Sequence, residues 1–312
     1  MVGVFRRSLS FPNKNPNRPS HKPHISHHIR SISLPSRSHP LISQIKEDTK
    51  NLTKWASNCN THPLASKDLS HALTLLKDTH ETLQHILHLP QTLDSLRSHP
   101  MWLENLLEHF LRFVDAYGMF QTSLFALKED HSSAQMALRK RDESKVVAYV
   151  KAKKKIAKEM EMLVSGLRCV TVSVTQHQQS MLHVPASVVD AELRHVIADV
   201  MSVTVSVSVA LFNGIATSFA SRRLSWVQMV KLSRIGGRVK KENEGIEELR
   251  QRDGVESLKN LKNKGDEEMR LVFKRMRDLE ECICAIETVS EKVFRALINS
   301  RVALLNTLTL TQ

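Results

Sequence analysis

Residues 101–130 read MWLENLLEHFLRFVDAYGMFQTSLFALKED, and this stretch decides the fold class. Its apolar residues recur at intervals of three and four: Leu103, Leu106, Phe110, Phe113, Tyr117, Phe120, Leu124 and Leu127. Such spacing predicts one apolar stripe along an amphipathic α-helix of about seven turns. The aromatic residues within the stripe make it the predicted centre of the core.

The composition extends this prediction to the rest of the chain. A length of 312 residues allows one large or two medium domains. Six of the ten prolines fall within residues 1–40, so the remainder is nearly free of helix-breaking residues. We therefore predict an all-α protein, a long-helix antiparallel bundle over residues 41–312 that follows a disordered basic N-terminal arm, residues 1–40.

Two helices are predicted before the opening stretch. The first carries Leu41, Ile45, Leu52 and Trp55 on one stripe, and the second carries Leu69, Leu73, Leu76, Leu83 and Leu87. We expect the segment Ser66-Lys67-Asp68 to provide the N-cap of the second helix and Pro90 to stop it.

Two long helices are predicted after it. From Asp142 the stripe runs through Val146, Tyr149, Ile156, Met160, Leu163, Leu167, Val170, Val174 and Met181, with Lys153 and His177 at positions of the same stripe. We expect His177 to be a hydrogen-bonded interface residue rather than a ligand. After Pro185 and a predicted cap at Ser187, the next stripe runs through Leu193, Val196, Val200, Val203, Val207, Leu211 and Gly214.

One segment of that last helix gives conflicting signals. Residues 203–209 alternate Val with Thr or Ser at a period of two, which is typical of a half-buried strand. The segment lacks a convincing partner strand, so the longer helical period decides in favour of helix.

The C-terminal part follows a basic loop, residues 234–241. An acidic start from Glu242 favours a helix N-terminus, and a heptad-like series then runs through Met269, Val272, Met276, Leu279, Ile283, Ile286, Val293, Leu297 and Leu304, interrupted by Ser290 and Ser300. We interpret it as one wall of the bundle, with coiled-coil self-association as the alternative. The predicted core includes Phe110, Phe113, Tyr117, Leu163, Leu167, Ile283 and Ile286.

The arm contains the candidate regulatory site. The motif R-S-x-S-x-P occurs twice, with Arg7, Ser10 and Pro12 in the first copy and Arg30, Ser33 and Pro35 in the second. An Arg three residues before a Ser suits a basophilic kinase, and a Pro two residues after it suits the phosphoserine groove of 14-3-3 proteins. The alternative is that a stretch rich in Arg and Ser produced both copies by chance.

The net charge of +13 is unevenly distributed. The arm has seven Lys and Arg and no acidic residue, so the body is only mildly basic. No zinc-finger or RNP motif accompanies the charge, and we expect no specific nucleic-acid binding; weak association with anionic membranes remains open. Arg139, Lys140 and Arg141 followed by Lys151, Lys153, Lys154 and Lys155 resemble a bipartite nuclear signal, but their predicted helical setting favours a solvated basic face.

Two alternatives concern the location of the protein. Residues 200–221 carry no charge and could span a membrane, although seven Ser or Thr and Asn213 fit a buried bundle helix better. The arm is rich in Ser and Arg and free of acidic residues, as is a cleaved plastid transit peptide. We expect a cytoplasmic protein, with membrane association and the plastid as alternatives.

The remaining reactive residues give no catalytic pattern. Cys59, Cys169, Cys282 and Cys284 lack C-x-x-C spacing and are interpreted as reduced thiols, and the four arm histidines, His21, His24, His27 and His28, as part of a polar disordered segment. We predict no enzyme, no cofactor, no metal and no small-molecule substrate.

The segment HIRSISLPSRSHP, residues 28–40, followed by a helix that contains Trp55, resembles the opening of the plant-specific BYPASS-related family. This resemblance implies a plant protein with an all-helical domain, no established biochemical activity, and a link to root and shoot development through a mobile signal. Our hypothesis is a non-enzymatic helical adaptor in developmental signalling, regulated through its arm. The alternative is a membrane-associated factor that uses the basic arm or residues 200–221.

Overall fold

The structure is a computed structural model that describes residues 39–59, 64–181, 188–220, 245–252 and 265–309. The described residues are almost entirely helical: α1 Pro40–Cys59, α2 Ser66–Leu87, α3 Pro90–Ser98, α4 Pro100–Arg139, α5 Glu143–Met181, α6 Val188–Phe219, α8 Glu247–Arg252 and α9 Asp266–Thr309. The predicted all-α fold of packed long helices is confirmed.

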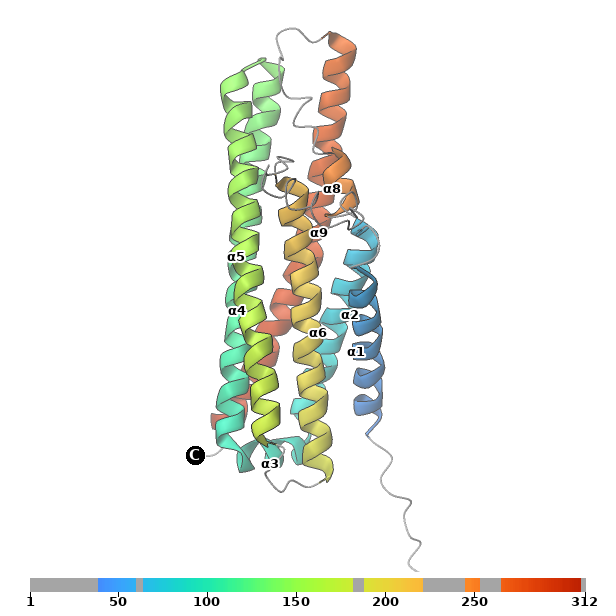
Figure 1. The fold of residues 1–312 in the computed structure, drawn as a ribbon, viewed down its shortest axis with the longest axis vertical. Coiled ribbons are helices and arrows are strands. Elements are labelled where there is room, and N and C mark those ends of the chain that lie inside the picture. Colours follow the sequence, from blue (N-terminus) through green and yellow to red (C-terminus); the bar gives the residue numbers. More distant parts are fainter. Residues whose placement is uncertain (1–38, 60–63, 182–187, 221–244, 253–264, 310–312) are drawn as a thin grey trace, which may run out of the picture. The chain divides into compact units, whose positions relative to one another are not determined.

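Figure 1 shows the long helices side by side, with consecutive long helices running in opposite directions. Helix α5 packs between α4 and α6, α9 packs against α4 and α2, and α1 covers the junction of α2 and α6. Every long helix therefore has at least two neighbours for its apolar stripe, which is how such amphipathic helices become stable.

The aromatic stripe of α4 lies at the centre of the core, as predicted. Tyr117 and Phe120 meet Phe212 of α6 with ring centroids 5.8 and 5.1 Å apart, and Phe110 meets Phe113 edge to face at 6.1 Å. All seven residues of the predicted core are buried: Phe110, Phe113, Tyr117, Leu163, Leu167, Ile283 and Ile286.

Several predicted helix boundaries are wrong. The opening stripe is only part of α4, which continues to Arg139. Helix α2 does end before Pro90, at Leu87, as predicted, but Pro90 also begins α3, because a proline at the first helical position loses no hydrogen bond. Ser66 is the first residue of α2 rather than its N-cap, since Ala65 holds the cap position and makes no side-chain cap bond.

The segment with alternating Val residues is helical, as predicted, within α6. By length and composition α6 could cross a membrane, and 67% of its most apolar 18-residue stretch is buried inside the protein. The Ser and Thr hydroxyls of the alternating segment form hydrogen bonds within α6. Thr204 and Ser208 each donate to the backbone carbonyl four residues earlier, at 2.6 and 2.7 Å. A β-like sequence is thereby accommodated in a buried helix.

The segment just before the short helix α8 contacts two longer helices, α2 near its start and α6 near its end. Ile246, just before α8, forms an isolated parallel bridge with Leu64 near the start of α2, and its backbone N–H also approaches the Gly214 carbonyl of α6 at 3.3 Å. Ile246 is fully buried. The residue before it, Gly245, has φ +102°, a left-handed conformation that favours glycine.

Candidate functional site

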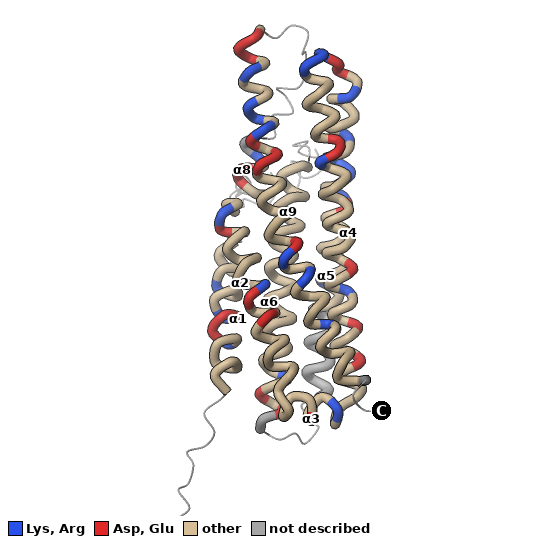
Figure 2. Tube along the Cα trace, turned by 180° about the vertical axis from the view of Figure 1, so that it is seen from behind, with Lys and Arg blue, Asp and Glu red and all other residues tan. Residues whose placement is uncertain are grey.

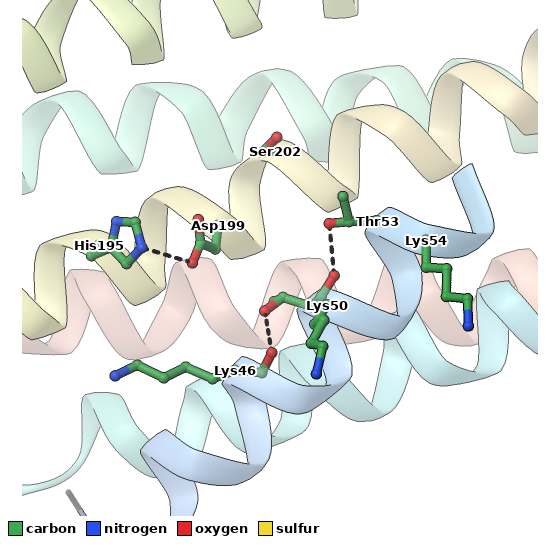
Figure 3. A pocket seen from close by; sticks show the side chains of 8 residues that line it. Lys46, Lys50, Thr53, Lys54, His195, Asp199 and Ser202 are labelled. Atoms are coloured by element: carbon green, nitrogen blue, oxygen red, sulfur yellow. Dashed lines mark hydrogen bonds and ion pairs between the residues drawn. The ribbon is translucent and has the colours of Figure 1, made fainter. Parts of the chain in front are cut away.

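Two groups of polar side chains in the described part of the chain stand out: an open surface groove between α1 and α6, and a set of buried polar side chains between α2, α4, α5, α6 and α9. Figure 3 shows the groove. It has a volume of about 560 Å³ and is lined by Lys46, Thr49, Lys50, Thr53, Lys54, His195, Asp199 and Ser202.

The groove follows from helical spacing on both walls. Lys46, Lys50 and Lys54 occupy positions i, i+4 and i+8 of α1, so they lie on one side of that helix. His195 and Asp199 face them from α6, also four residues apart (Figure 3). The groove is therefore a row of ammonium groups opposite a shorter row of polar side chains.

An ion pair of Lys46 neutralises part of this charge, and His195 contacts a carboxylate of its own helix. Lys46 Nζ lies 2.6 Å from Glu192 Oε1, and His195 Nε2 lies 3.5 Å from Asp199 Oδ2. Burial raises the pKa of the Asp199 carboxyl, although His195 and Lys46 act in the opposite direction. Such a groove suits a small anion. In the described residues no group of three or more His, Cys, Asp or Glu could hold a metal ion.

The buried polar side chains begin with His80 of α2, which is fully buried. Its Nε2–H donates to Thr204 Oγ1 at 3.0 Å, because the Thr204 hydroxyl itself donates to a backbone carbonyl. Ser300 Oγ of α9 lies 3.4 Å from the other ring nitrogen. Burial lowers the pKa of His80 to about 3, so the imidazole is neutral at physiological pH.

Tyr117 of α4 continues this set one turn along α6. Its hydroxyl donates to Ser208 Oγ at 3.1 Å, because Ser208 donates to the Thr204 carbonyl. Burial raises the pKa of Tyr117, and the tyrosine stays neutral. These bonds tie α2, α4, α6 and α9 together with uncharged groups, which specifies one alignment of the helices.

A second buried set surrounds His131 of α4. Its Nε2–H donates to the Met276 carbonyl of α9 at 3.0 Å, and Nδ1 accepts from the Tyr149 hydroxyl of α5 at 2.8 Å. Burial lowers the pKa of His131 and nearby Lys153 lowers it further, while Glu280 acts in the opposite direction. Lys153 Nζ lies 4.9 Å from the centre of the Tyr149 ring, a cation–π contact.

Only some of the site residues predicted from the sequence lie within the part of the chain that the structure describes. Arg7, Ser10, Pro12, Arg30, Ser33 and Pro35 lie outside the described residues, as do the side chain of His177, the cap residue Ser187 and the loop of residues 234–241. Lys153 lies in the apolar stripe of α5 and is buried, as its position in the stripe predicts. The prediction of a uniformly solvated basic face is therefore wrong at Lys153, while Lys151, Lys154 and Lys155 are exposed.

The buried hydrogen bonds of His80, Thr204 and Ser208 were not predicted, although the sequence holds a signal for that of His80. His80 falls four residues after Leu76 and three before Leu83, where the α2 stripe calls for an apolar residue. Ser300 interrupts the α9 stripe in the same way and is also fully buried. A polar residue at a stripe position thus marks a buried hydrogen bond.

Comparisons with known proteins place the chain in one family. The family model described as Protein BPS1 matches residues 72–307, from α2 to the end of the α9 stripe. No curated protein and no solved structure matches the chain. The matched region covers most of the helical bundle, and the chain therefore belongs to the BPS1 (BYPASS1) family.

Proposed function

We propose that this chain is a non-enzymatic helical adaptor or regulatory protein in plant root and shoot developmental signalling. The observation that carries this proposal is the mutual pairing of the buried polar groups, His80 with Thr204 and Tyr117 with Ser208. His80 and Tyr117 are fully buried and neither lines the surface groove, so a substrate in that groove does not reach them, and their bonds support packing of the helices. Partner proteins would then bind to the surface of the bundle and to the arm. The plant and developmental context is carried over from the family.

The arm is the proposed regulatory element. Ser10 and Ser33, once phosphorylated after Arg7 and Arg30, would each present a phosphoserine followed by a turn-forming proline. The two serines are 23 residues apart. A flexible connector of that length has a root-mean-square reach of roughly 26 Å, enough to engage both grooves of one 14-3-3 dimer.

Titration of phosphopeptides covering residues 4–38 with 14-3-3 protein tests this role. The doubly phosphorylated peptide should bind on the order of a hundredfold more tightly than either single form, because the second capture is intramolecular. The unphosphorylated peptide is the control. Equal affinity of double and single forms would eliminate the bivalent clamp, and no binding by any form would eliminate 14-3-3 as the partner.

Proximity labelling in plant cells with the full chain and with a chain lacking residues 1–40 addresses the adaptor role itself. We propose that the protein acts in the cytoplasm, so the full chain should label a reproducible set of cytoplasmic proteins. Members of this set that disappear without the arm are arm-dependent partners. A labelled set no different from that of an unrelated helical protein contradicts the adaptor role.

A membrane-associated factor is the second candidate, and the length and apolar character of α6 favour it. Membrane fractionation followed by carbonate washing separates the two candidates, since a spanning helix resists the wash and an adaptor is released. N-terminal sequencing of the plant-expressed protein tests the plastid alternative at the same time. A mature start beyond Ser33 would remove the arm from any account of function.

A further inference from the structure

The outer face of α5 carries positive charge and exposed apolar side chains together. The exposed residues of this face are Val147, Ala148, Lys151, Lys154, Lys155, Lys158 and Met162. Their spacing of three and four puts them on one side of the helix, over a length of about 22 Å. We call these seven residues the basic face of α5.

Acidic residues lie at the two ends of this part of α5 and are absent from its middle; the exposed Glu143 precedes it. From Ser144 to Lys158 the helix contains six lysines and no Asp or Glu on any side; Glu159 and Glu161 follow only at its far end. The turn before α5 adds the exposed Arg139 and Lys140 of the α4 end. Figure 2 shows Lys and Arg recurring toward the end of the bundle that holds this turn.

The lysines of the basic face are directed to solvent rather than consumed by ion pairs. Among the four lysines, all of which lie in the described part of α5, Lys155 alone forms an ion pair, a 3.7 Å contact with Glu159. The neighbouring carboxylate at the turn, Asp142, is engaged by the backbone N–H and hydroxyl of Ser144 at 3.0 and 2.6 Å. The row from Lys151 to Lys158 therefore presents a positive field, which Glu159 and the exposed Glu161 reduce at the Met162 end.

The two longest of the chain's remaining segments carry the same charge as this face. Residues 1–38 contain seven Lys and Arg and no acidic residue, and residues 221–244 contain seven Lys and Arg against two Glu. Both repel the basic face. We therefore look for a complementary surface, rich in negative charge, outside the chain.

We infer that the basic face of α5 docks on the surface of anionic phospholipid bilayers. Val147 is 52% exposed and Met162 is 61% exposed, at opposite ends of the row of lysines. Apolar side chains among lysines can enter the headgroup region while the lysine stems lie along it and their ammonium groups meet phosphates. Nucleic acid would use the charge but not these apolar groups, and the face offers no aromatic side chain for base stacking.

Vesicle co-sedimentation of the full chain tests this inference. Vesicles of phosphatidylcholine with phosphatidylserine should bind the protein, and vesicles of phosphatidylcholine alone should not. The variant with Lys151, Lys154, Lys155 and Lys158 changed to Gln should bind on the order of several hundredfold more weakly, because each lysine near an anionic surface contributes roughly fivefold. Met162→Gln should weaken binding severalfold even at low salt.

Two control variants remove equal numbers of charges elsewhere. One changes Arg270, Lys274, Arg275 and Arg277 at the start of α9 to Gln, and the other changes Arg6, Arg7, Lys14 and Arg18 of the arm. Both should retain most of the binding, and circular dichroism should show the same helix content and unfolding temperature for all variants. The arm variant also separates this inference from the membrane role considered for the arm.

Three results would overturn the inference. The first is equal binding of the Lys151/Lys154/Lys155/Lys158 variant and the parent chain. The second is loss of binding in the arm variant alone. The third is tight binding to a single-stranded RNA homopolymer, unaffected by Met162→Gln and without vesicle binding, which would assign the face to nucleic acid instead.

Discussion

The backbone N–H of Ser66, the first residue of α2, donates a 2.8 Å hydrogen bond to Oε2 of Glu248, which lies 182 residues later in the chain. The first N–H groups of a helix have no partner within it, and the positive end of the helix dipole favours a carboxylate there. Glu248 therefore acts as a cap supplied by α8. Beside it, the Glu247 N–H donates to the Leu64 carbonyl at 3.0 Å.

The first prediction concerns this cap. Glu248→Ala should lower the free energy of unfolding by about 1 kcal/mol, because an N–H of α2 loses its acceptor and the charge at the helix end disappears. Glu248→Gln keeps an acceptor without the charge and should cost less. Urea unfolding followed by circular dichroism measures both. If Ala and Gln variants match the parent in stability, the contact contributes nothing to the cap.

The second prediction uses two helical glycines with opposite surroundings. A Cβ at Gly214 of α6 would lie 2.9 Å from Ile246 Cγ1 and 3.2 Å from Leu64 Cδ2, whereas a Cβ at Gly166 of α5 meets nothing within 4 Å. Gly214→Ala should therefore destabilise the protein by roughly 1–3 kcal/mol through overpacking. Gly166→Ala should stabilise it by up to about 1 kcal/mol through helix propensity.

Thermal unfolding of the two glycine variants checks this contrast directly. The unfolding temperature should fall for Gly214→Ala and rise or stay level for Gly166→Ala. A rise in both variants would show that the contact between α6 and the segment before α8 yields without cost, and that Ile246 does not hold α6 in place.

The long helices could be predicted from the sequence because the spacing of apolar residues within one segment is enough to identify a helix. A spacing of three and four along one segment fixes which side is buried, so the stripe containing Phe110 and Tyr117 could be assigned without knowing its neighbours. The short helix α3 that Pro90 begins was not predicted, because proline is compatible with both the end of one helix and the start of another. Local rules cannot choose between these two uses.

The polar contacts could not be predicted because their partners are distant in the chain. His80 bonds to Thr204, 124 residues away, and lies near Ser300, 220 residues away. A gap in a stripe reveals that a polar residue is buried, but the residue that satisfies it depends on the alignment of two helices. The surface groove is equally non-local, since Lys50 and Asp199 come from separate helices.

The third prediction tests the core. Leu167 of α5 is buried, and Leu167→Asp would place a carboxylate without a partner among apolar side chains, which costs several kcal/mol or forces protonation. The helical bundle should be lost or melt at a much lower temperature. Ser165→Asp, two residues earlier and exposed, is the control and should melt as the parent does. An unchanged unfolding temperature for Leu167→Asp would mean that this stripe does not face the core.

The fourth prediction follows from the buried imidazole of His80. Its pKa is about 3 in the folded state, below the unperturbed value of about 6.5 expected after unfolding. Between these values the unfolded chain binds the proton and the folded chain does not, so the stabilising effect is complete above pH 6.5 and declines as pH falls toward 3. The free energy of unfolding should drop by up to about 1.4 kcal/mol per pH unit from this group.

Urea unfolding between pH 7 and pH 5, where most carboxylates remain ionised, is compared for the parent and His80→Gln, because the buried His131 contributes to the pH dependence of both chains. His80→Gln should be less stable than the parent at pH 7, because the imidazole packing and the bond to Thr204 are disturbed, but its stability should decline less with falling pH. His85→Gln, on the exposed side of the same helix, should keep the parent's pH dependence. Equal slopes for the parent and His80→Gln would mean that the imidazole titrates alike in both states, in which case water reaches His80 in the folded protein.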